Sequence, residues 1–267
     1  MKKVLFLLIV CITVTNTFAK QVDTIDVLST SMKIIVKNVV ILPADYESKT
    51  KLPVLYLLHG YEGNHKSWIK IKPELPDLAT KYGIIIVCPD GKNSWYWDSP
   101  VNQSMKYETY ISKELTQYID SNYKTGDDKS GRAITGLSMG GHGGLWIGIR
   151  HQDIFGACGS TSGGVDIRPF PNNWEMENAL GSYQKNSERW NNHTVINQLH
   201  LIKPGLEIII DCGTEDFFYE VNENLHRELI KRNIKHDYIS HPGVHNAKYW
   251  SNSIEYQILF FSNYFKK

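Results

Sequence analysis

The chain has 267 residues, of which 42% are hydrophobic and 21% charged, and its formal net charge is +1. A chain of this length can bury one large core, and α/β folds of this size commonly form a single domain. Because 29 Lys and Arg residues nearly balance 28 Asp and Glu residues, no bulk charge attracts nucleic acid or an anionic membrane. We therefore expect a small-molecule or oligosaccharide ligand and no nucleic-acid partner.

The N-terminus has the pattern of a signal peptide. Two lysines precede an apolar run at residues 4–14, and small residues follow up to Ala19. This run is shorter than the roughly 20 residues of a membrane-spanning helix. We expect a signal peptide at 1–19, one mature domain at 20–267, export to the periplasm or the extracellular space, and no integral membrane segment after cleavage.

The cysteines bear on lipid attachment and on disulfide or metal binding. Lipid attachment at Cys11 would also mean export, but the bulky Val10 stands where such signals have a small residue. Without the signal peptide Cys88, Cys158 and Cys212 remain, and an odd number cannot all pair within one chain. None has metal-ligand spacing, so we expect neither a disulfide framework nor a bound metal.

Strand-like and helix-like segments alternate along the chain. An antiparallel hairpin is expected within 27–42, around Ser29-Thr30-Ser31. Short, nearly continuous apolar runs, typical of parallel strands buried on both faces, follow at 52–58, 83–88, 132–135 and 206–210. Helical patterns lie at 75–82, 107–123, 140–151 and 221–233. The alternation predicts an α/β fold with a mostly parallel central sheet and helices on both faces.

Residues 165–199 interrupt this alternation. The segment is rich in Asn and Pro and resembles an irregular insertion between the sixth and seventh strands. A long connection of this kind is more often a lid or a pocket wall than a passive linker.

A G-x-S-x-G pentapeptide at 136–140 joins a β-branched run to a helix-compatible stretch. This is the sequence form of a nucleophile elbow, in which a tight turn projects the serine hydroxyl above the sheet. Gly136 and Gly140 would let strand and helix approach closely. The pattern therefore predicts Ser138 as a nucleophile.

An activated serine needs a base and a group that orients the base, and in α/β-hydrolases the chain order is serine, acid, histidine. Asp216 lies far enough into the loop after a buried strand to reach a histidine of the next loop, so we favour it as the acid. Asp211, at the strand end, and Glu215 are the alternatives. His245, in the loop before the final helix, is the expected base.

The other histidines near these segments have simpler interpretations. His241 lies at a strand end as a surface or packing residue, and His142 is expected as a helix-face residue in the first turn of the elbow helix. The oxyanion requires two backbone N–H donors. Met139 and Tyr61 stand in the right places for them, and His59 is expected to brace the Tyr61 loop.

Tryptophans are concentrated in loop-like, Asn-rich surroundings. Aromatic clusters are usually core, but rings in such segments can also form pocket walls that stack on sugars or phenolic acyl groups. We take Trp95, Trp97, Trp174 and Trp190 as candidate substrate-binding residues.

Several motifs in register resemble the esterase D family. The similarity spans roughly residues 52–265, and the motifs that carry it are Leu57-Leu58-His59-Gly60, Trp95-Tyr96-Trp97-Asp98, the segment 107–115, the segment 136–142, Asp211-Cys212-Gly213-Thr214-Glu215-Asp216 and Gly243-Val244-His245 with Trp250. That family groups S-formylglutathione hydrolases, tributyrin-type esterases, feruloyl and acetyl-xylan esterases, and mycolyltransferases.

The resemblance implies an α/β-hydrolase fold and a serine acyl-enzyme formed without a metal or organic cofactor. Position by position, it assigns the nucleophile to Ser138, the acid to Asp216 and the base to His245. The expected function is an exported serine carboxylic-ester hydrolase acting on short acyl or hydroxycinnamoyl esters, including those of carbohydrates. The alternatives are acyl transfer to a sugar and a non-catalytic carbohydrate-binding module; oligomeric state, acyl chain and alcohol stay open.

Overall fold

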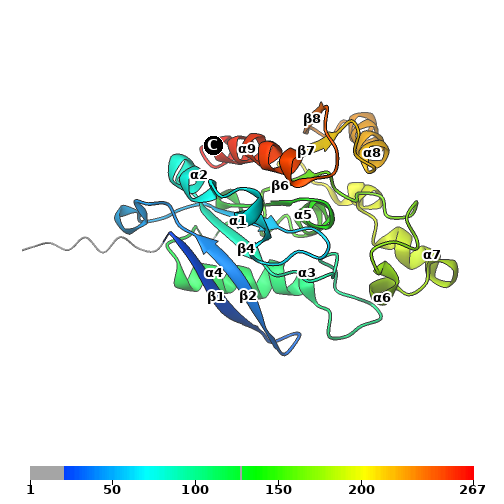
Figure 1. The fold of residues 1–267 in the computed structure, drawn as a ribbon, viewed down its shortest axis with the longest axis horizontal. Helices are drawn as coiled ribbons and strands as arrows, with labels where there is room; N and C mark the ends of the chain where they lie inside the picture. The colour runs from blue at the N-terminus through cyan, green and yellow to red at the C-terminus, as the bar shows by residue number, and fades with distance from the viewer. Residues whose placement is uncertain (1–20, 127) are drawn as a thin grey trace, which may run out of the picture.

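A computed structural model describes residues 21–126 and 128–267 (Figure 1). The expected signal peptide and Cys11 lie outside these residues. Eight strands form a single sheet in the order β1-β2-β4-β3-β5-β6-β7-β8. The strands are β1 (Val22–Ser29), β2 (Ile34–Ile41), β3 (Val54–Leu58), β4 (Ile85–Pro89), β5 (Arg132–Gly136), β6 (Ala157–Thr161), β7 (Glu207–Gly213) and β8 (Asp237–His241).

The sheet is antiparallel at one edge and parallel elsewhere. Strand β1 pairs with β2, and β2 pairs with β4, in antiparallel register, whereas the pairs from β4 to β8 are all parallel. The α/β-hydrolase fold predicted from the sequence is confirmed. The expected hairpin is present, but its first strand begins at Val22, upstream of the apolar residues that indicated it.

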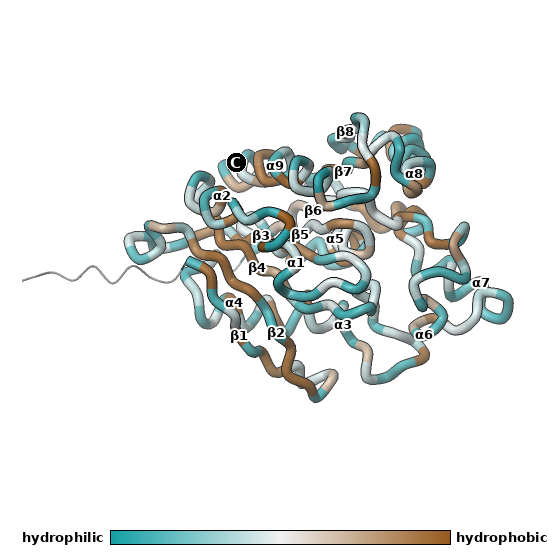
Figure 2. The backbone as a smooth tube through the Cα atoms, in the orientation of Figure 1, coloured by the Kyte–Doolittle hydropathy of each residue, from teal (hydrophilic) through white to brown (hydrophobic). Residues whose placement is uncertain are grey.

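Helices cover both faces of the sheet (Figure 1). The side chains of α1 (Ser67–Ile71), α2 (Leu75–Tyr82) and α9 (Ala247–Tyr264) contribute to the core on one face. The opposite face packs against α5 (Met139–Arg150), α8 (Tyr219–Lys231) and the helical segment 107–122. Figure 2 shows the hydrophobic colour concentrated along the strands and the hydrophilic colour on loops and outer helix surfaces.

The predicted helix at 107–123 forms as one continuous run with a changed winding. It begins as α3 (Tyr107–Thr109), continues as a π-helical segment (Tyr110–Leu115) and ends as α4 (Thr116–Asn122). Apolar spacing predicted the helix, but it does not distinguish α from π winding.

The insertion between β6 and β7 is more regular than expected. It contains α6 (Met176–Leu180), α7 (Tyr183–Asn192) and a 3₁₀ helix (Val195–Leu201). The prediction of an irregular segment is therefore wrong for its second half. Its polar, Asn-rich sequence has weak helix propensity, and buried anchors such as Trp190 stabilise the helices through tertiary packing.

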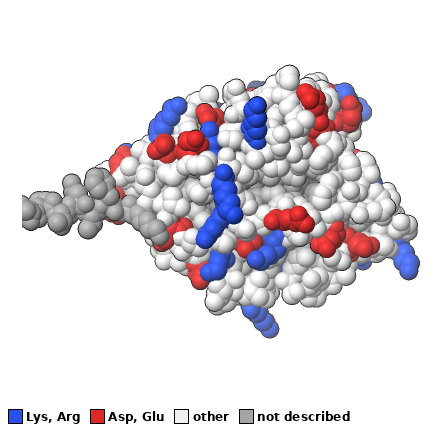
Figure 3. Space-filling model, in the orientation of Figure 1, with Lys and Arg blue, Asp and Glu red and all other residues white. Residues whose placement is uncertain are grey.

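Charges are mixed on the surface of the molecule. Figure 3, in the orientation of Figure 1, shows basic and acidic side chains interspersed among wide uncharged areas. Within residues 21–126 and 128–267, no helix has both the length and the apolar character needed to cross a membrane. Cys88, Cys158 and Cys212 are free and buried, and burial raises the pKa of each thiol.

Candidate active site

The pentapeptide around Ser138 forms a sharp turn between β5 and α5. Ser138 has φ 55° and ψ −118°, a conformation that costs free energy in a residue with a side chain. A Cβ atom added at Gly136 would lie 2.5 Å from the Leu58 carbonyl oxygen, and one added at Gly140 would lie 2.3 Å from the same atom. Only glycine fits at both positions. The same steric constraint therefore explains the two glycines of the sequence pattern and the close approach of the turn to β3.

Ser138, His245 and Asp216 form a continuous hydrogen-bonded chain. The Oγ atom of Ser138 lies 2.9 Å from Nε2 of His245, and Nδ1 of His245 lies 2.8 Å from Oδ2 of Asp216. Because a carboxylate can only accept, Nδ1 carries the proton and Nε2 is left to accept from the serine hydroxyl. This is the tautomer that a general base needs.

Asp216 is held by the backbone as well as by the histidine. Its side chain is fully buried, and its Oδ1 atom accepts a hydrogen bond of 2.8 Å from the backbone N–H of Phe218. The two carboxylate oxygens therefore have separate partners, which fixes the rotation of the group. Of the three candidate acids, Asp216 is the one that contacts His245.

The alternative acids have other surroundings. Glu215 is exposed, and its backbone N–H donates to the carbonyl of Gly243. Asp211 is buried beneath the site, where its Oδ2 atom accepts from Thr161 Oγ1 at 2.9 Å and from Gln257 Nε2 at 2.5 Å. Burial raises the pKa of Asp211 to about 6, although these hydrogen bonds oppose the shift. Asp211 braces the sheet against α9 rather than orienting the base.

The other histidines have structural roles. His241 stacks on Tyr249, with ring centroids 4.7 Å apart. His142 lies in the first turn of α5 and is fully buried, and burial lowers its pKa to about 3. It packs edge-on against Trp95 and Trp97, because this turn of the helix faces the core.

The loop after β3 carries one of the expected oxyanion donors. His59 accepts from the Gly91 N–H at 2.8 Å, and its Nδ1 atom lies 2.7 Å from the carbonyl of Gly60. Both ring nitrogens thus bind backbone, which holds the loop next to the elbow. Tyr61 follows directly in this loop, and Met139 is the first residue of α5, where backbone N–H groups have no helical partner.

A cavity of about 440 Å³ opens beside Ser138 and His245. Its walls come from the loop after β3, from α1, from the insertion and from the start of α9. The lining residues are Gly60, Tyr61, Glu62, Gly63, Ser67, Ile71, Leu137, Ser138, Trp174, Phe217, His245 and Trp250. The nucleophile and the base therefore face a cleft of a size that accepts a small ligand.

Of the four candidate tryptophans, Trp174 is the one that lines this cleft. Trp95 and Trp97 are buried and stack on each other with centroids 5.6 Å apart. Trp190 is buried in the insertion, where its Nε1 donates to the Gly181 carbonyl. The structure therefore contradicts the expected place of Trp95, Trp97 and Trp190 at a pocket wall. Their polar, loop-like sequence surroundings suggested exposed rings, but the rings pack inside the folded protein.

Two aromatic wall residues were missed as candidates. Phe217 is 52% exposed and packs on His245 with ring centroids 4.2 Å apart. Trp250 meets the same imidazole edge to face at 4.9 Å. The position of Phe217 directly after Asp216 was the available signal, since a residue next to a triad acid lies near the base.

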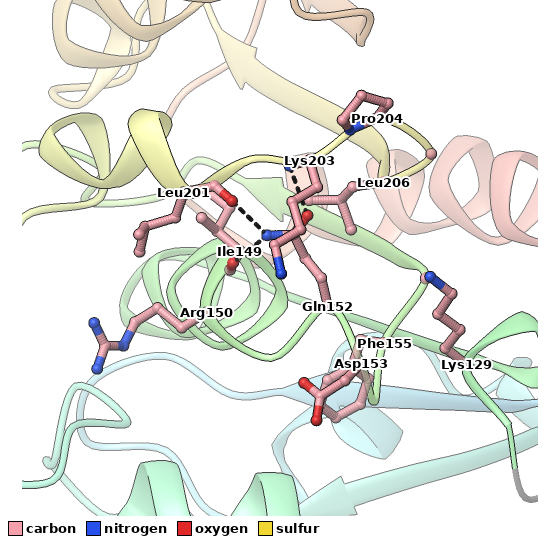
Figure 4. A pocket seen from close by; sticks show the side chains of 12 residues that line it. Lys129, Ile149, Arg150, Gln152, Asp153, Phe155, Leu201, Lys203, Pro204 and Leu206 are labelled. Carbon is pink, nitrogen blue, oxygen red and sulfur yellow. Dashed lines mark hydrogen bonds between the residues drawn. The ribbon is translucent and has the colours of Figure 1, made fainter.

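A second cavity of about 430 Å³ lies away from these residues (Figure 4). Its lining includes Lys129, Phe155 and Leu206, which precede β5, β6 and β7 and so mark the opposite end of the strands. There Gln152 bonds to the carbonyls of Ile149 and Leu201. Among residues 21–126 and 128–267, no three His, Cys, Asp or Glu side chains are grouped so that they could hold a metal ion.

Comparisons with known proteins agree on one group. The family model Esterase matches residues 29–261. An acetyl esterase of Caldicellulosiruptor saccharolyticus is 25% identical over 235 residues, which are 80% of this chain and 88% of the relative. A solved ferulic acid esterase superposes with a TM-score of 0.81 at 25% identity, covering 93% of this chain and 99% of that one.

A fluorophosphonate-binding serine hydrolase of Staphylococcus aureus, FphF, has the same TM-score of 0.81 at 21% identity. The match covers 90% of this chain and 98% of FphF. At this level of identity the similarity concerns the fold.

Proposed function

Because the chain belongs to the Esterase family and is a carboxylic-ester hydrolase, we propose that it cleaves short-chain acyl or hydroxycinnamoyl esters, with carbohydrates as the alcohol, through a Ser138–His245–Asp216 acyl-enzyme mechanism. One observation carries the mechanism: the 2.9 Å and 2.8 Å contacts that join the three side chains at the mouth of the cleft. The acyl range is supported by the acetyl esterase and ferulic acid esterase relatives.

In the first half-reaction, Ser138 Oγ attacks the ester carbonyl while His245 Nε2 takes its proton. The backbone N–H groups of Met139 and Tyr61 stabilise the oxyanion, and the N-terminus of α5 adds its dipole. When the C–O bond breaks, His245 returns the proton to the departing alcohol. In the second half-reaction, His245 activates a water that releases the carboxylic acid and frees Ser138.

The test uses 4-nitrophenyl acetate and a fluorophosphonate probe with the purified protein. Ser138→Ala and His245→Ala should each lower kcat by on the order of 10⁴ with the fold intact, because either change disables the nucleophile. The double variant should be hardly slower than either single one. A single variant that keeps more than about a tenth of the turnover, a loss of about 1.4 kcal/mol or less, would remove that residue from the mechanism.

The substrate range and the export are tested separately. A panel of acetyl, butyryl and feruloyl esters, with acetylated and feruloylated xylan fragments, measures the acyl and alcohol preferences. We also propose that the chain is exported, on the strength of the pattern at 1–19. N-terminal sequencing of the protein from a cell envelope or medium fraction should begin at Lys20, and a full-length cytosolic product would contradict export.

A further inference from the structure

The cleft beside Ser138 has an uneven charge. Among the described residues that line it, Glu62 is the only Asp or Glu, and there is no Lys or Arg. A second carboxylate, that of Glu175, directly follows the lining residue Trp174 in the insertion, and the hydroxyl of Tyr61 hydrogen-bonds to it. Burial and then this carboxylate raise the pKa of Tyr61. The loop after β3 and the insertion thus each bring one carboxylate to the cleft.

The backbone presents both carboxylates in an unusual way. Glu62 has φ 59°, and Trp174 and Glu175 have φ 51° and 52°. Left-handed conformations in residues other than glycine cost free energy, and they persist where surrounding contacts hold them. Here the Glu62 N–H donates to Asn93 Oδ1, so this wall is fixed by a side chain outside the cleft.

The wall formed by the insertion is fixed by ring contacts. Trp174 stacks on Phe217 with centroids 5.8 Å apart and 21° between the planes, and it packs on Phe218 at 5.2 Å. These contacts hold Trp174, and with it Glu175, at the cleft that Ser138 also lines. Aromatic faces carry partial negative charge, so the rings and the two carboxylates have the same electrostatic preference.

Neither carboxylate is neutralised by a basic partner. The ion pairs among residues 21–126 and 128–267 include neither Glu62 nor Glu175. Both are exposed, and their field reaches a ligand that enters the cleft beside them.

We propose that Glu62 and Glu175 select the esters of this cleft by charge, so that neutral and cationic substrates enter and anionic ones are rejected. The inference rests on the proposed ester hydrolysis for its substrate. It assigns specificity to two residues that take no part in bond breaking.

The experiment compares three phenyl acetates that differ in one meta substituent: a trimethylammonium group, an uncharged methyl carboxylate ester and a free carboxylate. kcat/KM is measured for the protein, Glu62→Gln, Glu175→Gln and the double variant. Glu188→Gln is the matched control, because Glu188 is an exposed glutamate of the insertion that does not line the cleft. Leaving-group reactivity cancels, since each variant is compared with the parent on the same ester.

Each substitution should raise the ratio of anionic to cationic turnover by about threefold to tenfold, and the double variant by more than either. The ratio of the parent should approach that of the double variant at 1 M salt, where the Debye length is about 3 Å. Glu188→Gln should leave the ratio unchanged. A merely structural role of the two glutamates would change all three rates equally, and that result would overturn the proposal.

Binding separates this inference from the proposed function. The same esters are titrated against Ser138→Ala by tryptophan fluorescence, which needs no turnover. Affinity in the order cationic, neutral, anionic, lost when both glutamates are also replaced, supports charge selection even if no ester is cleaved. Equal affinities would overturn it even in an active esterase.

Discussion

The assignment of Asp216 gives the sharpest test of the site. Asp216→Asn preserves the size of the side chain, so the outcome depends on hydrogen-bond donors alone. The backbone N–H of Phe218 donates to Oδ1 at 2.8 Å. The amide oxygen of the substituted side chain must take this position, because its NH₂ group would face another donor there. The NH₂ group is then left facing His245 Nδ1.

That orientation forces the histidine into the wrong tautomer. Nδ1 must accept from the amide, so Nε2 carries the proton and can no longer take one from Ser138 Oγ, 2.9 Å away. Loss of the correct tautomer at a triad typically lowers kcat by about 10⁴, which corresponds to about 5.5 kcal/mol of transition-state stabilisation. Folding should change little, since the side chain keeps its shape.

The assay measures kcat/KM with 4-nitrophenyl acetate, the rate of fluorophosphonate labelling and the thermal midpoint. Asp211→Asn and Glu215→Gln are the controls, because neither side chain contacts His245. Both should keep turnover within about threefold of the parent. If Asp216→Asn stays active while one control is folded and inactive, the orienting acid is that other residue.

Further predictions concern packing and pH. Trp190→Ala should lower the free energy of unfolding by about 3–5 kcal/mol, measured in urea, because its ring is buried, whereas Trp174→Ala should mainly change KM. Gly140→Ala should lose activity and thermal stability, since its Cβ would lie 2.3 Å from a backbone oxygen; Gly131→Ala, whose Cβ would have no neighbour among the described residues closer than 3.7 Å, should be tolerated. Burial raises the pKa of Asp211 from 3.8 to about 6. The folded state therefore retains a proton that the unfolded chain releases, so stability should fall by about 3 kcal/mol between pH 4 and 6. Asp211→Asn should remove this contribution, measured as the difference in pH dependence from the parent in urea titrations across that range, and an unchanged pH dependence would contradict the assignment.

Local constraints made part of the fold predictable from the sequence. The elbow leaves a signature because Gly136 and Gly140 meet the same carbonyl oxygen. Nearly continuous apolar runs indicated β3 and β4 because strands buried on both faces favour apolar residues at every position. The choice between Asp211 and Asp216 needed only chain position, because Asp216 lies in the loop after β7, whereas Asp211 lies within the strand, which continues to Gly213.

The exposure of aromatic rings was not predictable in this way. Trp95 and Trp97 stand in a polar, loop-like context, yet they stack on each other and cover His142. Which ring lines the cleft depends on contacts between segments far apart in the chain, such as Trp174 on Phe217. Charge selection by Glu62 and Glu175 was not predictable from the sequence for the same reason, because only folding brings the loop after β3 and the insertion to one cleft.

The loops that carry the acid and the base share backbone hydrogen bonds, whereas the elbow that carries the nucleophile is attached to another strand. The loop of Asp216 donates two backbone hydrogen bonds to the strand end and loop of His245, from Thr214 to His241 and from Glu215 to Gly243. The elbow is instead fixed to β6, through the Ser138 N–H and the carbonyl of Thr161. The His245–Asp216 pair therefore forms one unit, and its distance from Ser138 is set by how β7 lies against β6. Asp211 and Thr161 are paired in the register of those two strands and share a side-chain hydrogen bond. Asp211 therefore ties β7 to β6 beneath the site without touching the base.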